Sequence, residues 1–216
     1  MPVKIDLHVH TCYSYDSLVT REDLLFYARR CGLDGVAVTD HDRLDSAMKM
    51  ARELPIPILP GMEVTSRDGH IVALAVQRPV PKGLSAEETV EKIHEYGGIA
   101  VACHPTAFFR GSLREHVSSK FDAVEVINSS AFPFRYCVKK SMQVASRLGL
   151  PKVAGSDAHS GPEVGCAYSL VESDADVASV LEAIRKGLCT PRGGPVPFWV
   201  RLNRELAGFR RSRARF

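Results

Sequence analysis

Short apolar runs alternate with amphipathic stretches along most of the chain. The apolar runs predict strands over residues 3–8, 35–39, 56–64, 70–76, 99–103, 123–127, 152–155 and 167–171. The amphipathic stretches predict helices over residues 20–31, about 43–53, 85–96, 134–148 and 174–186. A strand followed by a helix, repeated along the chain, favours parallel strand pairing and an α/β layer fold or barrel.

Local signals refine this pattern. The link between Val64 and His70 is too short for a helix, so we expect a hairpin or local distortion there rather than a regular eight-fold barrel. Ser85 and Glu88 have the spacing of a capping box, which predicts the start of a helix. Gly97 and Gly149 fit the C-terminal ends of helices.

Composition narrows the class of protein. The length of 216 residues fits one domain, and 45% hydrophobic with 25% charged residues is typical of a soluble globular protein. No run approaches the ~18 apolar residues of a spanning helix. We expect no signal peptide, because the first residues enter strand-like sequence at once, and the six cysteines, none in a CxxC pair, are expected to be reduced. Together these features predict a cytoplasmic protein with no membrane association.

The positive charge is concentrated at the C-terminus. The chain has a net charge of +3, but residues 201–216 contain six arginines and one acid, so the other 200 residues sum to −2. The arginine-rich tail could bind a polyanion, such as RNA, or could be a solvated extension without a partner. The oligomeric state is not readable from the sequence.

Histidines gather where the predicted strands end. Six of the eight lie at or near strand ends, and five of these follow a strand, at the rim where α/β folds collect their ligands. His8 and His10 are two residues apart, so their imidazoles share one face of a strand and form either a chelate for a cation or a hydrogen-bonded polar rim. His70 begins its strand, and would reach the same rim only if that strand is antiparallel.

Acids accompany these histidines. Asp40 and Asp42 flank His41, either orienting a metal-bound imidazole or capping the next helix, and for Asp42 we favour the cap. Glu63 lies in an apolar strand, where a bare carboxylate is costly, so it should be paired, protonated or metal-bound.

Two more groups complete the pattern. His104 follows an apolar run, and Asp157 and His159 repeat the two-residue spacing after another. Nitrogen and oxygen donors from at least five strands therefore converge on one rim, where the acids would repel one another without cations.

These motifs together resemble those of a known family. The segments Asp6-Leu-His-Val-His-Thr, Thr39-Asp-His, Gly61-x-Glu63, His104-Pro and Ser156-Asp-Ala-His are similar, in order and spacing, to the motif series of the polymerase-and-histidinol-phosphatase (PHP) family. The resemblance covers residues 3 to about 172. The segment that follows, to Gly187, is similar to a region often appended to family members. We therefore expect a barrel domain over 1–200, with 173–200 as the family-associated segment, and a separate tail over 201–216.

The resemblance implies a distorted TIM-like barrel of about seven βα units with two or three divalent metal ions. Carried over by position, the ligands are His8, His10, Glu63 and Asp157 for the first ion; Glu63, His104 and His70 for the second; and Asp16, His41 and His159 for the third. His70 could instead be a hydrogen-bonded strand histidine. Cys12 and Cys103 lie beside ligands, where packing is favoured over a thiolate ligand.

The implied activity is hydrolysis of a phosphate ester by a hydroxide held between cations that Glu63 bridges, with Asp157 and His159 as further catalytic groups. Zinc, manganese and iron all suit such ligands. The expected substrate is a small phosphomonoester, and Arg110 and Arg135, otherwise surface charges, could grip it. The alternatives are an exonuclease or phosphodiesterase acting on short RNA or DNA, and a non-catalytic RNA-associated barrel subunit.

Overall fold

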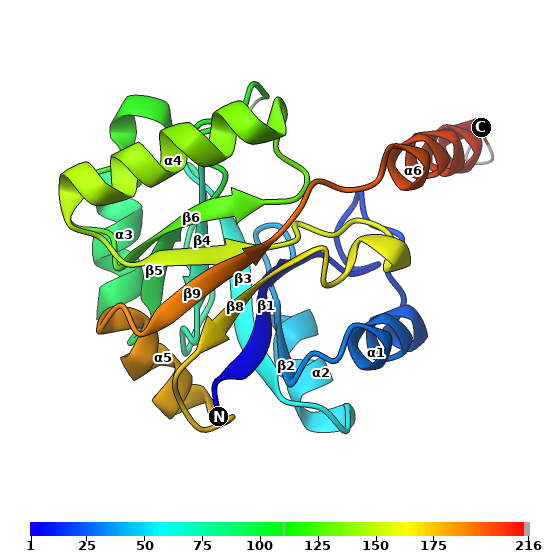
Figure 1. The fold of residues 1–216 in the computed structure, drawn as a ribbon, viewed down its shortest axis with the longest axis horizontal. Coiled ribbons are helices and arrows are strands. Elements are labelled where there is room, and N and C mark those ends of the chain that lie inside the picture. Colours follow the sequence, from blue (N-terminus) through cyan, green and yellow to red (C-terminus); the bar gives the residue numbers. More distant parts are fainter. Residues whose placement is uncertain (110, 214–216) are drawn as a thin grey trace.

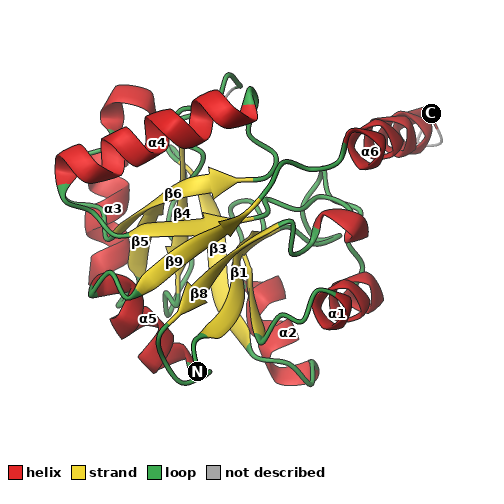
Figure 2. Ribbon diagram, in the orientation of Figure 1, coloured by secondary structure: helices red, strands yellow, loops and turns green. Residues whose placement is uncertain are grey.

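One nine-stranded sheet forms the centre of the molecule. The structure is a computed structural model that describes residues 1–109 and 111–213. The strand order is β7-β6-β5-β4-β3-β2-β1-β8-β9. The strands are β1 (Val3–Val9), β2 (Gly35–Val38), β3 (Ile58–Thr65), β4 (His70–Leu74), β5 (Ile99–Ala102), β6 (Ala123–Asn128), β7 (Lys152–Gly155), β8 (Ala167–Val171) and β9 (Cys189–Gly193). The sheet curls into a nearly closed barrel (Figure 2), and the backbone N–H of Ala154 in β7 donates to Ser169 Oγ in β8 at 2.8 Å across the closure.

Helices pack around the outside of this sheet (Figure 1). They are α1 (Arg21–Arg30), α2 (Asp45–Glu53), α3 (Ala86–Glu95), α4 (Phe134–Leu148), α5 (Val177–Arg185) and α6 (Phe198–Arg213), with 3-10 turns at Arg114–His116 and Gly161–Glu163. In Figure 1, α3 and α4 lie on one side of the barrel and α1 and α2 on the other, while α6 extends away from the body. Within the described residues, no helix combines the length and apolar character needed to cross a membrane.

Strand direction places the functional rim. The pairs β1–β2, β2–β3, β5–β6 and β6–β7 are parallel, whereas β4 is antiparallel to both β3 and β5. Thr65 at the end of β3 is paired with His70 at the start of β4. The predicted hairpin is therefore confirmed, and His70 lies at the same rim as the C-terminal ends of the parallel strands.

Both faces of the sheet are apolar. In β2, Val36 and Val38 belong to one cluster of buried hydrophobic side chains and Ala37 to another, as expected when successive side chains point to opposite faces. Such strands appear as continuous apolar runs, which is why the sequence located them well. Because the strands are buried between two apolar layers, most polar side chains of the sheet lie at the strand ends.

The α/β barrel prediction is confirmed, and the helix signals were accurate. The Ser85–Glu88 capping box opens α3, and Gly149, with a φ of 67°, ends α4. The prediction that Asp42 caps the next helix was wrong: α2 follows Leu44 without a side-chain cap, and Asp42 instead accepts the Thr65 backbone N–H at 2.7 Å.

Two elements were not predicted, β9 and α6. β9 is a short strand with mostly exposed residues and a proline at position 191, so it lacks the apolar signal that marks the others. Residues 198–200 precede the predicted tail, yet α6 runs continuously through them to Arg213.

Candidate metal centre

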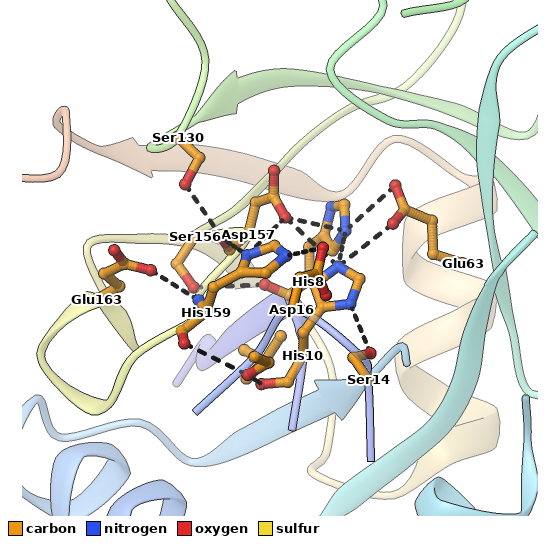
Figure 3. Close-up of polar contacts among 12 residues, drawn as sticks. His8, His10, Ser14, Asp16, Glu63, Ser130, Ser156, Asp157, His159 and Glu163 are labelled. Atoms are coloured by element: carbon orange, nitrogen blue, oxygen red, sulfur yellow. Dashed lines mark hydrogen bonds and ion pairs between the residues drawn. The ribbon is translucent and has the colours of Figure 1, made fainter. Parts of the chain in front are cut away.

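Five imidazole-bearing segments and three carboxylates meet at the C-terminal rim of the barrel. They come from the end of β1 and its following loop, the loop after β2, the strands β3 and β4, and the loops after β5 and β7. Figure 3 shows His8, His10, Asp16, Glu63, Asp157 and His159 pointing toward one another. The structure therefore brings all nine predicted ligands into one cluster: His8, His10, Asp16, His41, Glu63, His70, His104, Asp157 and His159.

Glu63 lies at the centre of the cluster with only 1% of its surface exposed. Its Oε1 lies 2.8 Å from His104 Nε2 and 3.1 Å from His70 Nδ1. Its Oε2 lies 2.9 Å from His41 Nδ1 and 3.3 Å from His10 Nε2. The two oxygens thus face different pairs of imidazoles, which is the arrangement needed for one carboxylate to bridge two cations.

The imidazoles of His8 and His10 are anchored through their outer nitrogens. His8 Nδ1 lies 3.1 Å from Glu125 Oε1, and His10 Nδ1 lies 3.2 Å from Ser14 Oγ. Their Nε2 atoms are 3.1 Å apart and lie 3.5 Å and 3.4 Å from Asp157 Oδ1. Histidines that bind metals are typically held in this way, with one nitrogen fixed by a protein group and the other facing the ion. The donor set therefore fits a divalent cation.

A third group of donors lies on the outer side of the cluster. Asp16 Oδ2 is 3.3 Å from His41 Nε2 and 3.4 Å from His159 Nε2. The side chain of Asp16 is 33% exposed and that of His159 is 15% exposed, whereas His8 and His10 are fully enclosed. A ligand from solvent would thus meet this group first.

The acids and histidines of the cluster shift one another's pKa values. Burial opposes the charge of His8, but Asp157 and Glu125 outweigh it and hold the His8 pKa well above its ordinary value. Burial is likewise outweighed at Glu63 and Asp157, whose pKa values are held well below the ordinary range by the surrounding histidines. At His41, the carboxylates of Asp16 and Glu63 overcome burial and raise the pKa to about 10. Without cations, protons on His8 and His41 balance these acids.

Backbone strain occurs at two of the ligands. His104 has a φ of 31° and Asp157 a φ of 54°, a left-handed region that non-glycine residues rarely adopt. Such conformations cost about 1–3 kcal/mol and gather at functional sites. The surrounding hydrogen bonds hold the strain, since Asp157 N donates to His8 O at 2.8 Å and His104 N donates to Glu125 Oε2 at 2.8 Å.

Glu125 supports two of the clustered histidines and was not predicted from the sequence. It is 3% exposed in the middle of β6, where its Oε1 holds His8 and its Oε2 accepts the backbone N–H of His104. Asn128, at the end of the same strand, donates Nδ2 to Glu125 Oε2 at 2.9 Å and to Asp157 Oδ2 at 3.3 Å. The signal was present, because Glu125 is an acid in an apolar strand, as is Glu63.

Two further buried acids build the scaffold of the rim. Asp40 accepts hydrogen bonds from the hydroxyls of Thr11, Ser14 and Ser46, and so fixes the serine that contacts His10. It therefore orients a neighbouring imidazole and not that of His41. Asp6 accepts the backbone N–H groups of Ser156 and Gly165, and burial raises its pKa to about 6.

The cysteines and arginines singled out in the sequence differ in how close they lie to the cluster. Burial and the charges of Glu63 and Glu125 raise the pKa of Cys103 well above its ordinary value, so it is a thiol, which contacts Glu63 Oε1 at 3.3 Å. Cys12 is exposed. Arg110 lies outside the described residues. Arg135 is exposed in the first turn of α4, and the polar contacts of the described residues do not connect it to the cluster.

Two arginines of the predicted tail instead brace the site. Arg204 Nη1 in α6 lies 3.1 Å from Oε1 of the buried Glu163, whose Oε2 accepts the backbone N–H of His159 at 2.6 Å. Arg201 donates to the carbonyl oxygen of Ser130 at 3.1 Å, and Ser130 Oγ donates to Asp157 O at 3.1 Å. The start of α6 is therefore tied to the loops that carry Asp157 and His159.

Comparisons with known proteins agree with this arrangement. Residues 6–139 match the profile of the PHP domain, and residues 138–189 match that of the PHP-associated region. The chain is 35% identical over 141 residues to the uncharacterized protein MJ1587 of Methanocaldococcus jannaschii, covering 59% of this chain and 82% of that protein.

Solved structures share the fold. A two-domain protein from Bacteroides vulgatus, which contains a predicted PHP-like metal-dependent phosphoesterase, superposes with a TM-score of 0.73 at 18% identity, covering 90% of this chain and 65% of that protein. The chain thus spans about two thirds of that relative. PsfC from Pseudomonas syringae superposes with a TM-score of 0.71 at 18% identity, covering 95% and 97% of the two chains.

Proposed function

Because the chain belongs to the PHP domain family, we propose that it is a metal-dependent phosphoesterase that hydrolyses a small phosphomonoester. The observation that carries this proposal is the geometry of Glu63, whose two buried oxygens face separate pairs of imidazoles. Burial opposes the negative charge of this carboxylate, and two bound cations would stabilise that charge.

The first two ions would share Glu63 as a ligand. His8, His10, Asp157 and Glu63 would hold the first ion, and Glu63, His104 and His70 the second. Asp16, His41 and His159 would hold a third, or two ions would suffice. Histidine and carboxylate ligands suit zinc, manganese and iron alike. When bound, such ions lower the pKa of water and neutralise phosphoryl oxygens.

The residues of the chain would supply position and protons. Glu125 and Ser14 fix the rings of His8 and His10 so that both Nε2 atoms face the same space. His159 lies on the solvent side, where Asp16 and Asp157 outweigh burial and raise its pKa. In the two-ion arrangement, His159, held by Asp16 through Nε2, would be the proton donor to the departing alcohol oxygen.

The test combines metal analysis with turnover. The purified chain, loaded with manganese, zinc or iron, should bind two or three ions and hydrolyse p-nitrophenyl phosphate. Glu63→Gln should lose more than about 100-fold in activity, beyond the range typical for groups that only orient ligands. Glu115→Gln, on an exposed side chain, should retain activity. A chain that binds no metal on titration would instead support a non-catalytic, RNA-associated role.

One observation favours a second candidate, a phosphodiesterase acting on short RNA or DNA. Phe198 and Trp199, at the start of α6, are 69% and 71% exposed, with their ring centroids 5.4 Å apart. Exposed aromatic rings beside arginines can stack the bases of single strands.

Two changes to α6 test this candidate. Trp199→Ala and a truncation after Arg204, which keeps the ion pair with Glu163, should both weaken oligonucleotide binding. The truncation should also reduce its salt dependence. Unchanged affinity in both variants would remove this candidate, and Phe26→Ala, on an exposed ring of α1, is the control.

A further inference from the structure

A cavity of about 710 Å³ lies between α4 and the loop that follows His104. One wall is a single face of α4, formed by Tyr136, Lys140, Gln143, Val144 and Arg147. Their spacing of three or four residues places them in a row along the helix. The proposed metal ligands do not line this cavity. We call it the α4 groove.

The loop forms the other wall and is fastened to the helix. Thr106 Oγ1 lies 2.9 Å from Ser141 Oγ and donates to Cys137 O at 3.1 Å. Phe108 and Phe109 of this loop have different surroundings. Phe109 packs against the His104 ring with centroids 5.0 Å apart, whereas Phe108 lines the groove. The groove and the metal centre therefore share one loop.

The groove is basic. Arg114, Lys140 and Arg147 line it, and no acid does. Within the described part of the chain, none of these three forms an ion pair. The whole of α4 carries four cations and no acid, whereas the first 200 residues sum to −2. Positive charge is thus concentrated on this helix, where it would attract an anion.

The groove is also aromatic. Phe108 is 63% exposed and Tyr136 is 44% exposed, and their rings meet edge to face with centroids 5.1 Å apart. Lys140 Nζ lies 5.9 Å from the centroid of the Tyr136 ring. Exposed rings beside unpaired cations suit a ligand that is planar at one end and anionic at the other.

We propose that the α4 groove binds a nucleotide, with its base against Phe108 and Tyr136 and its phosphate on Lys140 and Arg147. Lys140 is about one helical turn from Tyr136, and Arg147 is about two further turns along, a span of roughly 16 Å in total. This length accommodates a free nucleotide with several phosphates or successive nucleotides of a strand. The volume lies in the range of roughly 300–1,000 Å³ that is typical of small-ligand sites. This site goes beyond the proposed phosphoesterase activity, which requires only the metal centre.

Equilibrium binding to the full chain, with metal removed by a chelator so that the phosphate-ester probes are not hydrolysed, tests the proposal. The probes are AMP, ATP, a 5′-phosphorylated oligoadenylate and, as a ligand without a base, ribose 5-phosphate. The variants are Tyr136→Ala and the double substitution Lys140→Ala with Arg147→Ala. The control is Lys139→Ala, on the same helix and exposed but outside the groove. All these positions are exposed or partly exposed, and thermal melting checks that each variant folds.

Nucleotide binding that weakens at least about tenfold in both groove variants, but not in the control, is the expected result. Ribose 5-phosphate should bind more weakly than AMP. Preference for ATP would identify a free nucleotide as the ligand, and preference for the oligoadenylate a strand. Absence of nucleotide binding at millimolar concentration, or equal binding by wild type and groove variants, would overturn the proposal. Since binding is measured without turnover, either result is separable from failure of the phosphoesterase assay.

Discussion

Substitution of Glu125 by glutamine would disturb the metal centre without removing any ligand. The carboxylate accepts from His8 Nδ1 at 3.1 Å on one oxygen, and from His104 N at 2.8 Å and Asn128 Nδ2 at 2.9 Å on the other. A glutamine side chain has only one acceptor oxygen. Whichever way the amide turns, its NH₂ group faces a donor, so either His8 or the His104 backbone loses its partner.

The expected magnitude follows from these contacts. Loss of a group that orients a metal-bound histidine typically costs 10–100-fold in metal affinity, or about 1.4–2.7 kcal/mol. A buried donor left without a partner costs about 1–3 kcal/mol of stability. For a protein of this size, each kcal/mol lowers Tm by about 2–4 °C. Glu125→Gln should therefore bind metal more weakly and also melt earlier in its metal-free form.

Two assays separate these effects. Competition with a chelator gives the metal affinity, and calorimetric melting of the metal-free protein gives the stability. Glu115→Gln makes the same chemical change on an exposed residue and should alter neither quantity. If Glu125→Gln matched wild type in metal affinity, the inference that Glu125 positions His8 would be wrong.

Three other predictions follow from the same contacts. Metal affinity should rise between about pH 6 and pH 9. The pKa of His41 is raised to about 10 and that of His8 is also raised, so a cation must displace protons from these imidazoles. A metal affinity that does not change with pH, and no proton release in titration calorimetry, would contradict this. Arg204→Ala should lower the free energy of unfolding, measured by chemical denaturation, by up to about 3 kcal/mol, since it leaves the buried carboxylate of Glu163 without its cation. Arg204→Lys should restore part of this loss. A loss no larger than that of Arg192→Ala would mean that the ion pair with Glu163 does not stabilise the fold. Gly155→Ala should abolish metal binding, because a Cβ there would meet His8 Cβ and lie 2.7 Å from Glu125 Oε1. Gly194→Ala, with open space around it, should bind metal normally. Equal metal content in the two purified variants would contradict this prediction.

The sequence predicted the barrel because its strands are buried on both faces. Such strands leave uninterrupted apolar runs, and the residues that end them were visible as polar signals. The two-residue spacing of His8 and His10 and the acid at Glu63 have direct physical meaning in a strand. Their convergence on one cluster followed from the rule that ligands gather where parallel strands end.

Contacts between distant segments could not be predicted in the same way. Arg204 and Glu163 are 41 positions apart and share no motif, so the arginine-rich segment appeared to be a free tail. Glu125 holds His8 across 117 positions; an acid between Val124 and Val126 is a visible signal of a buried carboxylate, but its partner cannot be identified from the sequence. The α4 groove depends on how a loop packs on a helix, which no local pattern determines.

Anomalous X-ray diffraction from crystals of the zinc- or manganese-loaded protein, recorded at the absorption edge of the bound metal, would locate the ions relative to Glu63. We expect at least two peaks, one on either side of the Glu63 carboxylate, with His8, His10 and Asp157 around the first and His104 around the second. Metal-loaded crystals without a peak beside Glu63, or with the ions bound only elsewhere on the chain, would contradict this expectation.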